Sequence, residues 1–200
     1  MSAQSFWNDR YADDEFLYGT EPNGFLVEQH GLLRGPVLSI AEGEGRNAVY
    51  IASLGLDVLG VDSSSVGLAK AQRLAAMRGV SIRTECADLA TWTPSAASFG
   101  AVISIFAHLP RAVRARLYPR LEAALLPGGV LVLEAYHVRQ LARATGGPRD
   151  AELLMTAEDV AREFPSLEPV LLREVTREVV EGTGHTGVAE VVQFVGRRPR

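Results

Sequence analysis

The sequence lacks the features of secreted and membrane proteins. It has a single cysteine, Cys86, so no intrachain disulfide can form, which fits a reducing compartment. No apolar run approaches the roughly 20 residues that a membrane-spanning helix needs. The N-terminal stretch MSAQSFWNDRYADDEF has neither the basic nor the apolar region of a secretory signal. We therefore expect a soluble, cytoplasmic protein that does not associate with membranes.

Other absences narrow the class of function. The net charge is −4, and the basic residues are scattered rather than gathered into the stripe that nucleic acid would require. The four histidines show no metal-ligand spacing, and neither a P-loop nor a G-x-S-x-G elbow is present. A hydrophobic content of 47% over 200 residues is typical of one globular domain. We expect no metal and no nucleic-acid partner.

What the sequence does contain is an alternation of strand-like and helix-like segments. Such an alternation predicts an α/β fold: a Rossmann-like, doubly wound, mostly parallel sheet with helices on both faces. Two β-branched runs joined by the glycine-rich EGTGHTG predict a C-terminal antiparallel hairpin. Pro119 is expected to kink or divide its helix. The predicted strands are 36–41, 56–62, 80–88, 99–107 and 129–136, and the predicted helices are 46–55, 65–79, 111–125 and 156–164.

A glycine turn, AEGEGRN, follows the first predicted strand. In doubly wound sheets, ligands bind beyond the carboxyl ends of the strands, so this turn is a candidate cofactor site. Gly43, Gly45 and Ala48 formally satisfy the dinucleotide fingerprint, and Asp62 ends the next strand, where a carboxylate can accept ribose hydroxyls. A nicotinamide-binding oxidoreductase is therefore one hypothesis. Asp88 ends the third strand, where it can accept a hydrogen bond from an adenine amino group.

The turn, the two strand-end acids, LLPGGVLVLE and the closing hairpin occur in an order that resembles the class I S-adenosylmethionine-dependent methyltransferases. Within them, FWNDRYADDEFLYGTEPNGFL and GEGRNAVYIASLG look most like the small tellurite-resistance and thiopurine-type enzymes. Two positions depart from the family pattern: Ser39 replaces an acid and Ala41 replaces a glycine. Ala41 is expected to be tolerated with a negative φ, and Glu42 or Glu44 is expected to contact the cofactor's ammonium in place of the missing acid.

The resemblance implies S-adenosyl-L-methionine as cofactor and a division of the single domain into four parts. These are an N-terminal helical lid (1–30), a cofactor-binding core (36–136), an acceptor-side loop and helix (137–165) and the closing hairpin (166–197). The N-terminal aromatics either close over the sulfonium or pack a helix on the sheet edge. The predicted cofactor-binding residues are Trp7, Tyr11, Tyr18, Glu42, Gly43, Gly45, Arg46, Asn47, Asp62, Ser63, Asp88, Leu89, Ser104 and Ile105.

The candidate catalytic residues are His185, His108 and Tyr136, because a histidine can serve as general base near pH 7. His137, Arg139 and Gln140 are the candidate acceptor contacts, and an arginine there would suit an oxyanion. With no target-recognition domain and no basic face, the expected acceptor is a small molecule: tellurite, selenite, a thiol or another small nucleophile. A non-catalytic module that only binds the cofactor is a third hypothesis. A monomer and a homodimer are both compatible with the sequence.

Overall fold

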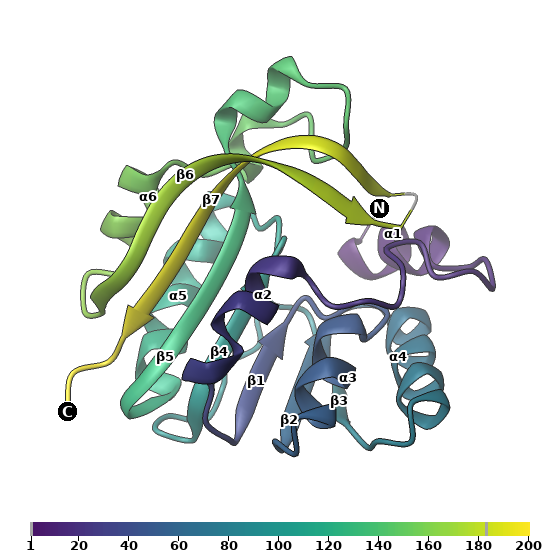
Figure 1. Ribbon diagram of the computed structural model, residues 1–200, viewed down its shortest axis with the longest axis horizontal. Helices are drawn as coiled ribbons and strands as arrows, with labels where there is room; N and C mark the ends of the chain where they lie inside the picture. Colours follow the sequence, from purple (N-terminus) through teal and green to yellow (C-terminus); the bar gives the residue numbers. More distant parts are fainter. Residues whose placement is uncertain (1, 183) are drawn as a thin grey trace.

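The computed structural model describes residues 2–182 and 184–200 and contains, within these residues, a seven-stranded sheet. The strand order is β3-β2-β1-β4-β5-β7-β6 (Figure 1). The first five strands in this order pair in parallel, and β7 pairs antiparallel with both β5 and β6. This arrangement confirms the predicted fold class. The strands are β1 (Val37–Ile40), β2 (Val58–Asp62), β3 (Arg83–Cys86), β4 (Phe99–Ile105), β5 (Leu125–Tyr136), β6 (Glu168–Glu181) and β7 (His185–Arg197).

The sheet has a hydrophobic core on each face because alternate side chains of a strand point to opposite sides. Ile103 of β4 packs in one core with Phe25 and Leu74, whereas Val102 packs in the other with Leu117 and Phe164. The helices that cover the sheet are α1 (Ala3–Arg10), α2 (Gly24–Gln29), α3 (Arg46–Ser53), α4 (Ser65–Met77), α5 (Arg111–Ala124) and α6 (Ala157–Glu163). Short 3-10 turns lie at His30–Leu32, Val138–Ala142 and Ala151–Leu153.

Helix α5 differs from the expectation, since it runs unbroken through Pro119. The neighbouring side chains Leu117, Tyr118 and Leu121 are almost completely buried in the core. We attribute the continuity of the helix to this packing, which offsets the backbone hydrogen bond that proline cannot donate.

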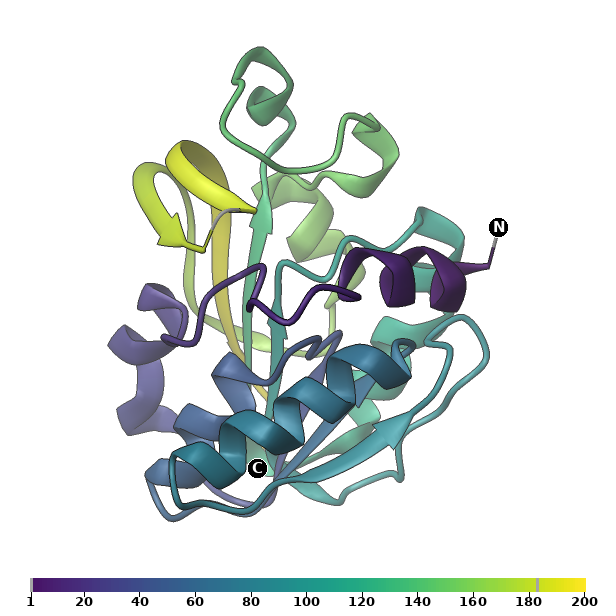
Figure 2. The same ribbon diagram turned by 90° about the vertical axis from the view of Figure 1, so that its right-hand side faces the viewer.

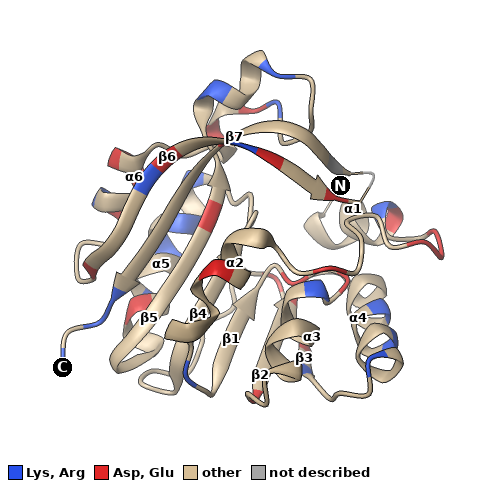
Figure 3. Ribbon diagram, in the orientation of Figure 1, with Lys and Arg blue, Asp and Glu red and all other residues tan. Residues whose placement is uncertain are grey.

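The N-terminal segment and the hairpin tip meet above the carboxyl ends of the parallel strands. In the turned view of Figure 2, α1 crosses above α4. The amide of Gly184 donates to the carbonyl of Leu17 at 3.1 Å, so the hairpin tip touches the chain that follows α1. In Figure 3 the basic residues are spread over several elements, among them α4, α5 and the C-terminal end. Among the described residues, no helix is long and apolar enough to cross a bilayer.

Candidate active site

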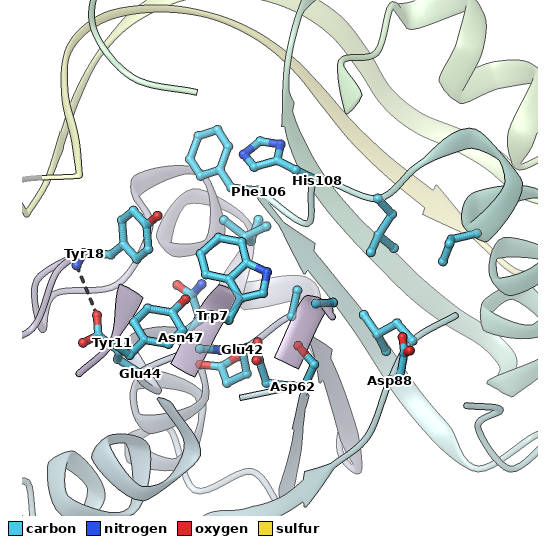
Figure 4. Close-up of a pocket in the computed structure, with 18 of the residues that line it drawn as sticks. Trp7, Tyr11, Tyr18, Glu42, Glu44, Asn47, Asp62, Asp88, Phe106 and His108 are labelled. Carbon is cyan, nitrogen blue, oxygen red and sulfur yellow. Dashed lines mark hydrogen bonds between the residues drawn. The ribbon is translucent and has the colours of Figure 1, made fainter. Parts of the chain in front are cut away.

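A cavity of about 320 Å³ lies at the carboxyl ends of β1, β2 and β4, under the N-terminal segment (Figure 4). This is the edge that the sequence predicts for ligand binding. The cavity is lined by Ala3, Trp7, Tyr11, Tyr18, Ala41, Glu42, Gly43, Glu44, Arg46, Asn47, Asp62, Ser63, Asp88, Leu89, Ala90, Ile105, Phe106, His108, Leu109, Pro110 and Val113.

Both glycines of the turn are required by its geometry. Gly43 and Gly45 have φ values of +58° and +93°, a region that side chains disfavour. A Cβ on Gly45 would lie 2.5 Å from the Cβ of Ala71, so this glycine allows α3 to approach α4 closely. A Cβ on Gly43 would lie 2.6 Å from the hydroxyl oxygen of Tyr11. The turn is therefore packed tightly between α4 and the N-terminal segment.

Ala41 does not meet the condition, a negative φ, on which its methyl was expected to be tolerated. Its φ is +50°, a left-handed conformation that glycine adopts without steric cost. An L-residue pays about 1–2 kcal/mol for this conformation. Ala41 therefore carries the strain that its methyl group adds in this conformation.

A buried carboxyl lies beneath the turn, close to the position of the missing acid. The Ser39 hydroxyl donates to Oε2 of Glu42, and the Ala48 amide donates to Oε1 at 2.8 Å. Burial raises the pKa of the Glu42 carboxyl to about 7, although both hydrogen bonds act in the opposite direction. The Glu42 carboxyl thus reaches back from the turn to the side chain of Ser39, the position where the family pattern has an acid.

Asp62 joins the turn to the start of α4. Its Oδ2 accepts from the Gly43 amide at 2.9 Å and its Oδ1 accepts from the Ser64 amide at 2.7 Å. The cap of α4 is Ser64, whose hydroxyl accepts from the Gly67 amide. Desolvation raises the pKa of the Asp62 carboxyl, while its backbone hydrogen bonds lower it. Asp62 belongs to the cavity lining, and Ser64 rather than Asp62 is the N-cap of α4.

The adenine-side candidates lie at the rim of the cavity. Asp88 is exposed and its Oδ1 accepts from the Ala90 amide at 2.9 Å, which fixes the loop after β3. Leu89 and Ser63 also line the cavity, and Leu89 is buried. The structure brings these three predicted residues together with Asp62.

Glu44 is engaged by the protein itself rather than left for a ligand ammonium. Its Oε1 lies 2.5 Å from Nζ of Lys70, and its Oε2 accepts from the Tyr18 amide at 3.2 Å. The Lys70 ammonium also donates to the carbonyls of Asp13 and Glu15, at 2.8 and 2.6 Å. Glu44 and Lys70 thus fasten the chain after α1 to the turn and to α4.

The predicted lid aromatics do reach the cavity. The rings of Trp7 and Tyr11 stack with centroids 5.5 Å apart, and Tyr11 meets Tyr18 edge-on at 6.2 Å. Burial raises the pKa of the Tyr11 phenol well above its ordinary value, so it remains protonated. Figure 4 shows these rings on the same side of the cavity as Glu44 and Asn47.

Three further rings form a wall beyond the end of β4. Tyr136 at the end of β5 lies 4.7 Å from Phe106 and stacks on His108 at 5.5 Å, centroid to centroid. Phe106 and His108 line the cavity, and Tyr136 contacts both rings without belonging to the described lining. Phe106 was missed in the sequence, although its place directly after a buried strand was a usable signal. We refer to Phe106, His108 and Tyr136 as the ring wall.

Arg46 and Asn47 line the cavity but have partners within the protein. Nη2 of Arg46 lies 2.6 Å from Oε2 of Glu181, at the hairpin. Oδ1 of Asn47 accepts from the Asn23 amide at 3.0 Å. Both side chains therefore tie the turn to neighbouring segments.

Several predicted residues lie apart from the cavity. Ser104 points towards Tyr118 on the opposite face of the sheet, while its neighbour Ile105 lines the cavity. Arg139 lies 2.9 Å from Glu174, and Nε2 of His137 lies 3.1 Å from the same residue. Gln140 is buried and accepts from the Glu190 amide, and Tyr136 does not belong to the described cavity lining. The side chain of His185 lies outside the described residues.

The cavity fits a nucleoside joined to an amino-acid chain. Backbone amides and the start of α3 at the turn favour a carboxylate, and Asp62 offers an acceptor for hydroxyls. The aromatic side of the cavity suits a positively charged sulfur. In the described part of the chain, His, Cys, Asp and Glu form no group suited to a metal ion.

Known proteins resemble this chain in sequence and in fold. Residues 37–129 match the family model described as a methyltransferase domain. The chain is 30% identical over 106 residues to 2-heptyl-1-hydroxyquinolin-4(1H)-one methyltransferase of Mycobacteroides abscessus, over 52% of this chain and 46% of that protein. It thus spans about half the length of this curated relative.

Solved structures share the fold over nearly the whole chain. The structure published as "Conversion of a Disulfide Bond into a Thioacetal Group during Echinomycin Biosynthesis" has a TM-score of 0.78 at 22% identity, covering 99% of this chain and 93% of that one. The N-methyltransferase NodS of Bradyrhizobium japonicum, bound to S-adenosyl-L-homocysteine, has a TM-score of 0.72 at 14% identity, covering 99% of both chains. Residues 37–129 thus match a methyltransferase domain, and the likeness to these two structures shows that nearly the whole chain shares their fold.

Proposed function

We propose that this protein transfers the methyl group of S-adenosylmethionine to a small, uncharged acceptor. The observation that carries the proposal is the division of one cavity into two halves. Carboxylates and the glycine turn line the half at β1 and β2, while rings and apolar side chains line the half beyond β4. The first half suits a cofactor with hydroxyls and a cationic sulfur, and the second suits an organic acceptor.

In the cofactor half, Asp62 receives the ribose hydroxyls, and Asp88 with Leu89 frames the adenine. The turn at Gly43 and Gly45 holds the methionine portion, and Trp7, Tyr11 and Tyr18 cover it. S-adenosylmethionine supplies an already activated methyl group, so the protein contributes mainly orientation and the exclusion of water.

His108 is the proposed proton acceptor for a nucleophile that arrives protonated. It lines the cavity directly after β4, and Tyr136 stacks on its imidazole and holds its orientation. A histidine titrates near pH 7, which suits a general base.

Charge favours an uncharged acceptor over an oxyanion such as tellurite. The acidic and basic side chains that line the cavity, apart from His108, are Glu42, Glu44, Arg46, Asp62 and Asp88, and the arginine is paired with Glu181. Arg139, the arginine expected to bind an oxyanion, pairs with Glu174 and Glu190 instead. The curated relative is named for a hydroxylated quinolone, which adds support for a small ring compound with a hydroxyl nucleophile.

Calorimetric titration tests the cofactor half. We expect S-adenosylhomocysteine to bind with micromolar affinity and NAD not to bind. Asp62→Ala is expected to weaken S-adenosylhomocysteine binding by about 1–3 kcal/mol, because it removes hydrogen bonds to a charged group. Binding of NAD alone would favour an oxidoreductase, and an unchanged affinity in the folded variant would remove Asp62 from the site.

Turnover separates an enzyme from a module that only binds the cofactor. Methyl transfer from radiolabelled S-adenosylmethionine should be screened over hydroxylated heteroaromatics, small thiols, selenite and tellurite. We expect the radiolabelled methyl group to be transferred to the uncharged ring compounds. Label in tellurite alone would overturn the argument from charge.

A further inference from the structure

The backbone at Phe106 is unusual. Its φ is +51°, a left-handed conformation that bulky side chains rarely adopt, and its amide donates to the Glu134 carbonyl at 2.7 Å. Strained backbone of this kind persists where the surroundings hold it, and it is concentrated at functional sites. Here the strained residue directly follows β4 and places a phenyl ring in the cavity lining.

The Phe106 ring lies next to two other rings, and apolar side chains line the same part of the cavity. Tyr136, in contact with both Phe106 and His108, is itself backed by the loop after β5: a Cβ on Gly147 would lie 2.9 Å from Cδ2 of Tyr136. Leu109, Pro110 and Val113 complete this half of the cavity. The ring wall is therefore backed by the loop after β5, and its neighbours Leu109, Pro110 and Val113 in the cavity lining carry no charge.

From this arrangement we infer that Phe106 determines acceptor specificity and that the acceptor is a planar, uncharged aromatic molecule bound against the ring wall. The inference rests on the proposed function, because it assigns the acceptor half of the same cavity. Offset-stacked rings attract one another beyond the burial of their area, which selects planar over puckered molecules. The acids in the other half of the cavity disfavour an anionic acceptor.

The test is binding of matched probes to the protein saturated with S-adenosylhomocysteine, measured by calorimetry. The probes are 1-naphthol, decahydro-1-naphthol, which has the same skeleton without planarity, and 1-naphthoate, which adds a negative charge. We expect 1-naphthol to bind about tenfold more tightly than either of the others. Equal binding of the three, or no binding of 1-naphthol, would overturn the inference.

Two variants assign the selectivity to Phe106. Phe106→Leu keeps the strained backbone and removes the ring, whereas Phe106→Gly removes both the ring and the strain. We expect both to lose the preference for 1-naphthol and to keep the affinity for S-adenosylhomocysteine within about twofold. Tyr50→Leu is the control, because it removes an aromatic ring of α3 that lies outside the cavity lining, and it should leave the preference for 1-naphthol intact.

The outcomes distinguish this inference from the proposed function. Selective binding of 1-naphthol that depends on Phe106, without methylation of any ring compound, would support the inference and count against the proposed function. If both Phe106 variants methylate ring compounds with unchanged selectivity, the result would support the proposed function and count against the inference about Phe106. Retained S-adenosylhomocysteine binding shows that each variant is folded.

Discussion

Arg46 at the start of α3 and Glu181 at the end of β6 form a buried ion pair, 2.6 Å long and 135 residues apart in sequence. Asn23 donates to Glu181 at 2.8 Å and to Glu134 at 2.6 Å, and Arg177 contacts both acids. This network links the glycine turn, α2 and the closing hairpin.

Removal of one charge from the network should be costly. Glu181→Ala is expected to lower the free energy of unfolding by about 3 kcal/mol, because it leaves Arg46 buried without its partner. Urea denaturation measures the change. Asp57→Ala breaks the exposed pair with Arg83 and should cost less than about 1 kcal/mol. The double variant Arg46→Met, Glu181→Leu should recover part of the stability that Glu181→Ala loses. Equal losses of stability in Glu181→Ala and Asp57→Ala would contradict a buried, interdependent pair.

Trp7 should distinguish the charged cofactor from its uncharged product. If its ring faces the sulfonium, Trp7→Ala weakens S-adenosylmethionine binding by about 0.5–1 kcal/mol more than S-adenosylhomocysteine binding, since only the first carries a positive sulfur. Calorimetry with both ligands measures the difference. Phe6→Ala removes the neighbouring ring, which is 48% exposed, and should affect both ligands equally. If Trp7→Ala weakens the binding of both ligands equally, the Trp7 ring packs against its neighbours without contacting the charged sulfur.

Glu42 should give the protein a recognisable pH dependence. An unfolded chain releases the proton of a glutamate near pH 4.3, whereas the folded protein holds that of Glu42 up to about pH 7. In this window the folded state binds more protons, so the contribution of Glu42 to stability falls as the pH rises and levels off above pH 7. Glu42→Gln can keep the bonds to Ser39 and Ala48 without ionising.

We therefore expect Glu42→Gln to match the wild type near pH 4.5 and to be more stable by about 3 kcal/mol at pH 8. Urea denaturation at intervals between these pH values measures both curves. Asp62, whose pKa is also raised, is present in both proteins and cancels in the comparison. Parallel curves would show that Glu42 is ionised in the folded protein at low pH.

Ala41→Gly should stabilise the protein. The change relieves the left-handed strain, partly offset by the greater entropy of glycine in the unfolded chain, for a net gain of about 0.5–1 kcal/mol. Ala97, at φ +46° on an exposed loop, offers a matched control. Ala97→Gly should give a similar gain in urea denaturation with no change in S-adenosylhomocysteine affinity. A loss of stability in Ala41→Gly would mean that the methyl of Ala41 makes favourable contacts that outweigh the strain.

Local patterns were enough to predict the fold and the position of the turn. Strand-length apolar runs, helix caps such as Ser64 and the glycines at 43 and 45 act over a few residues, so they can be read directly. The same holds for Asp62 and Asp88, whose places at strand ends follow from the strands themselves.

Side-chain partners across the fold could not be predicted in this way. Glu44 turns to Lys70 and Arg139 turns to Glu174 because the folded chain brings those charges close from distant segments. The conformation of Phe106 depends on its hydrogen bond to β5 and on Tyr136, which the sequence does not place beside it. The cavity is therefore lined by most of the predicted cofactor-binding residues, whereas of the predicted catalytic and acceptor-binding residues the described lining includes only His108.

The anchoring of the chain after α1 has a consequence for how ligands enter and leave. Lys70 and Glu44 hold residues 11–18, whereas α1 itself contains no buried residue and is joined to α4 by contacts such as the bond between Asn8 and Ser64. Segments with few buried contacts open at the lowest free energy. We therefore expect α1 to detach at a lower free energy than the anchored chain that follows it, which would open the side of the cavity that Ala3 and Trp7 line.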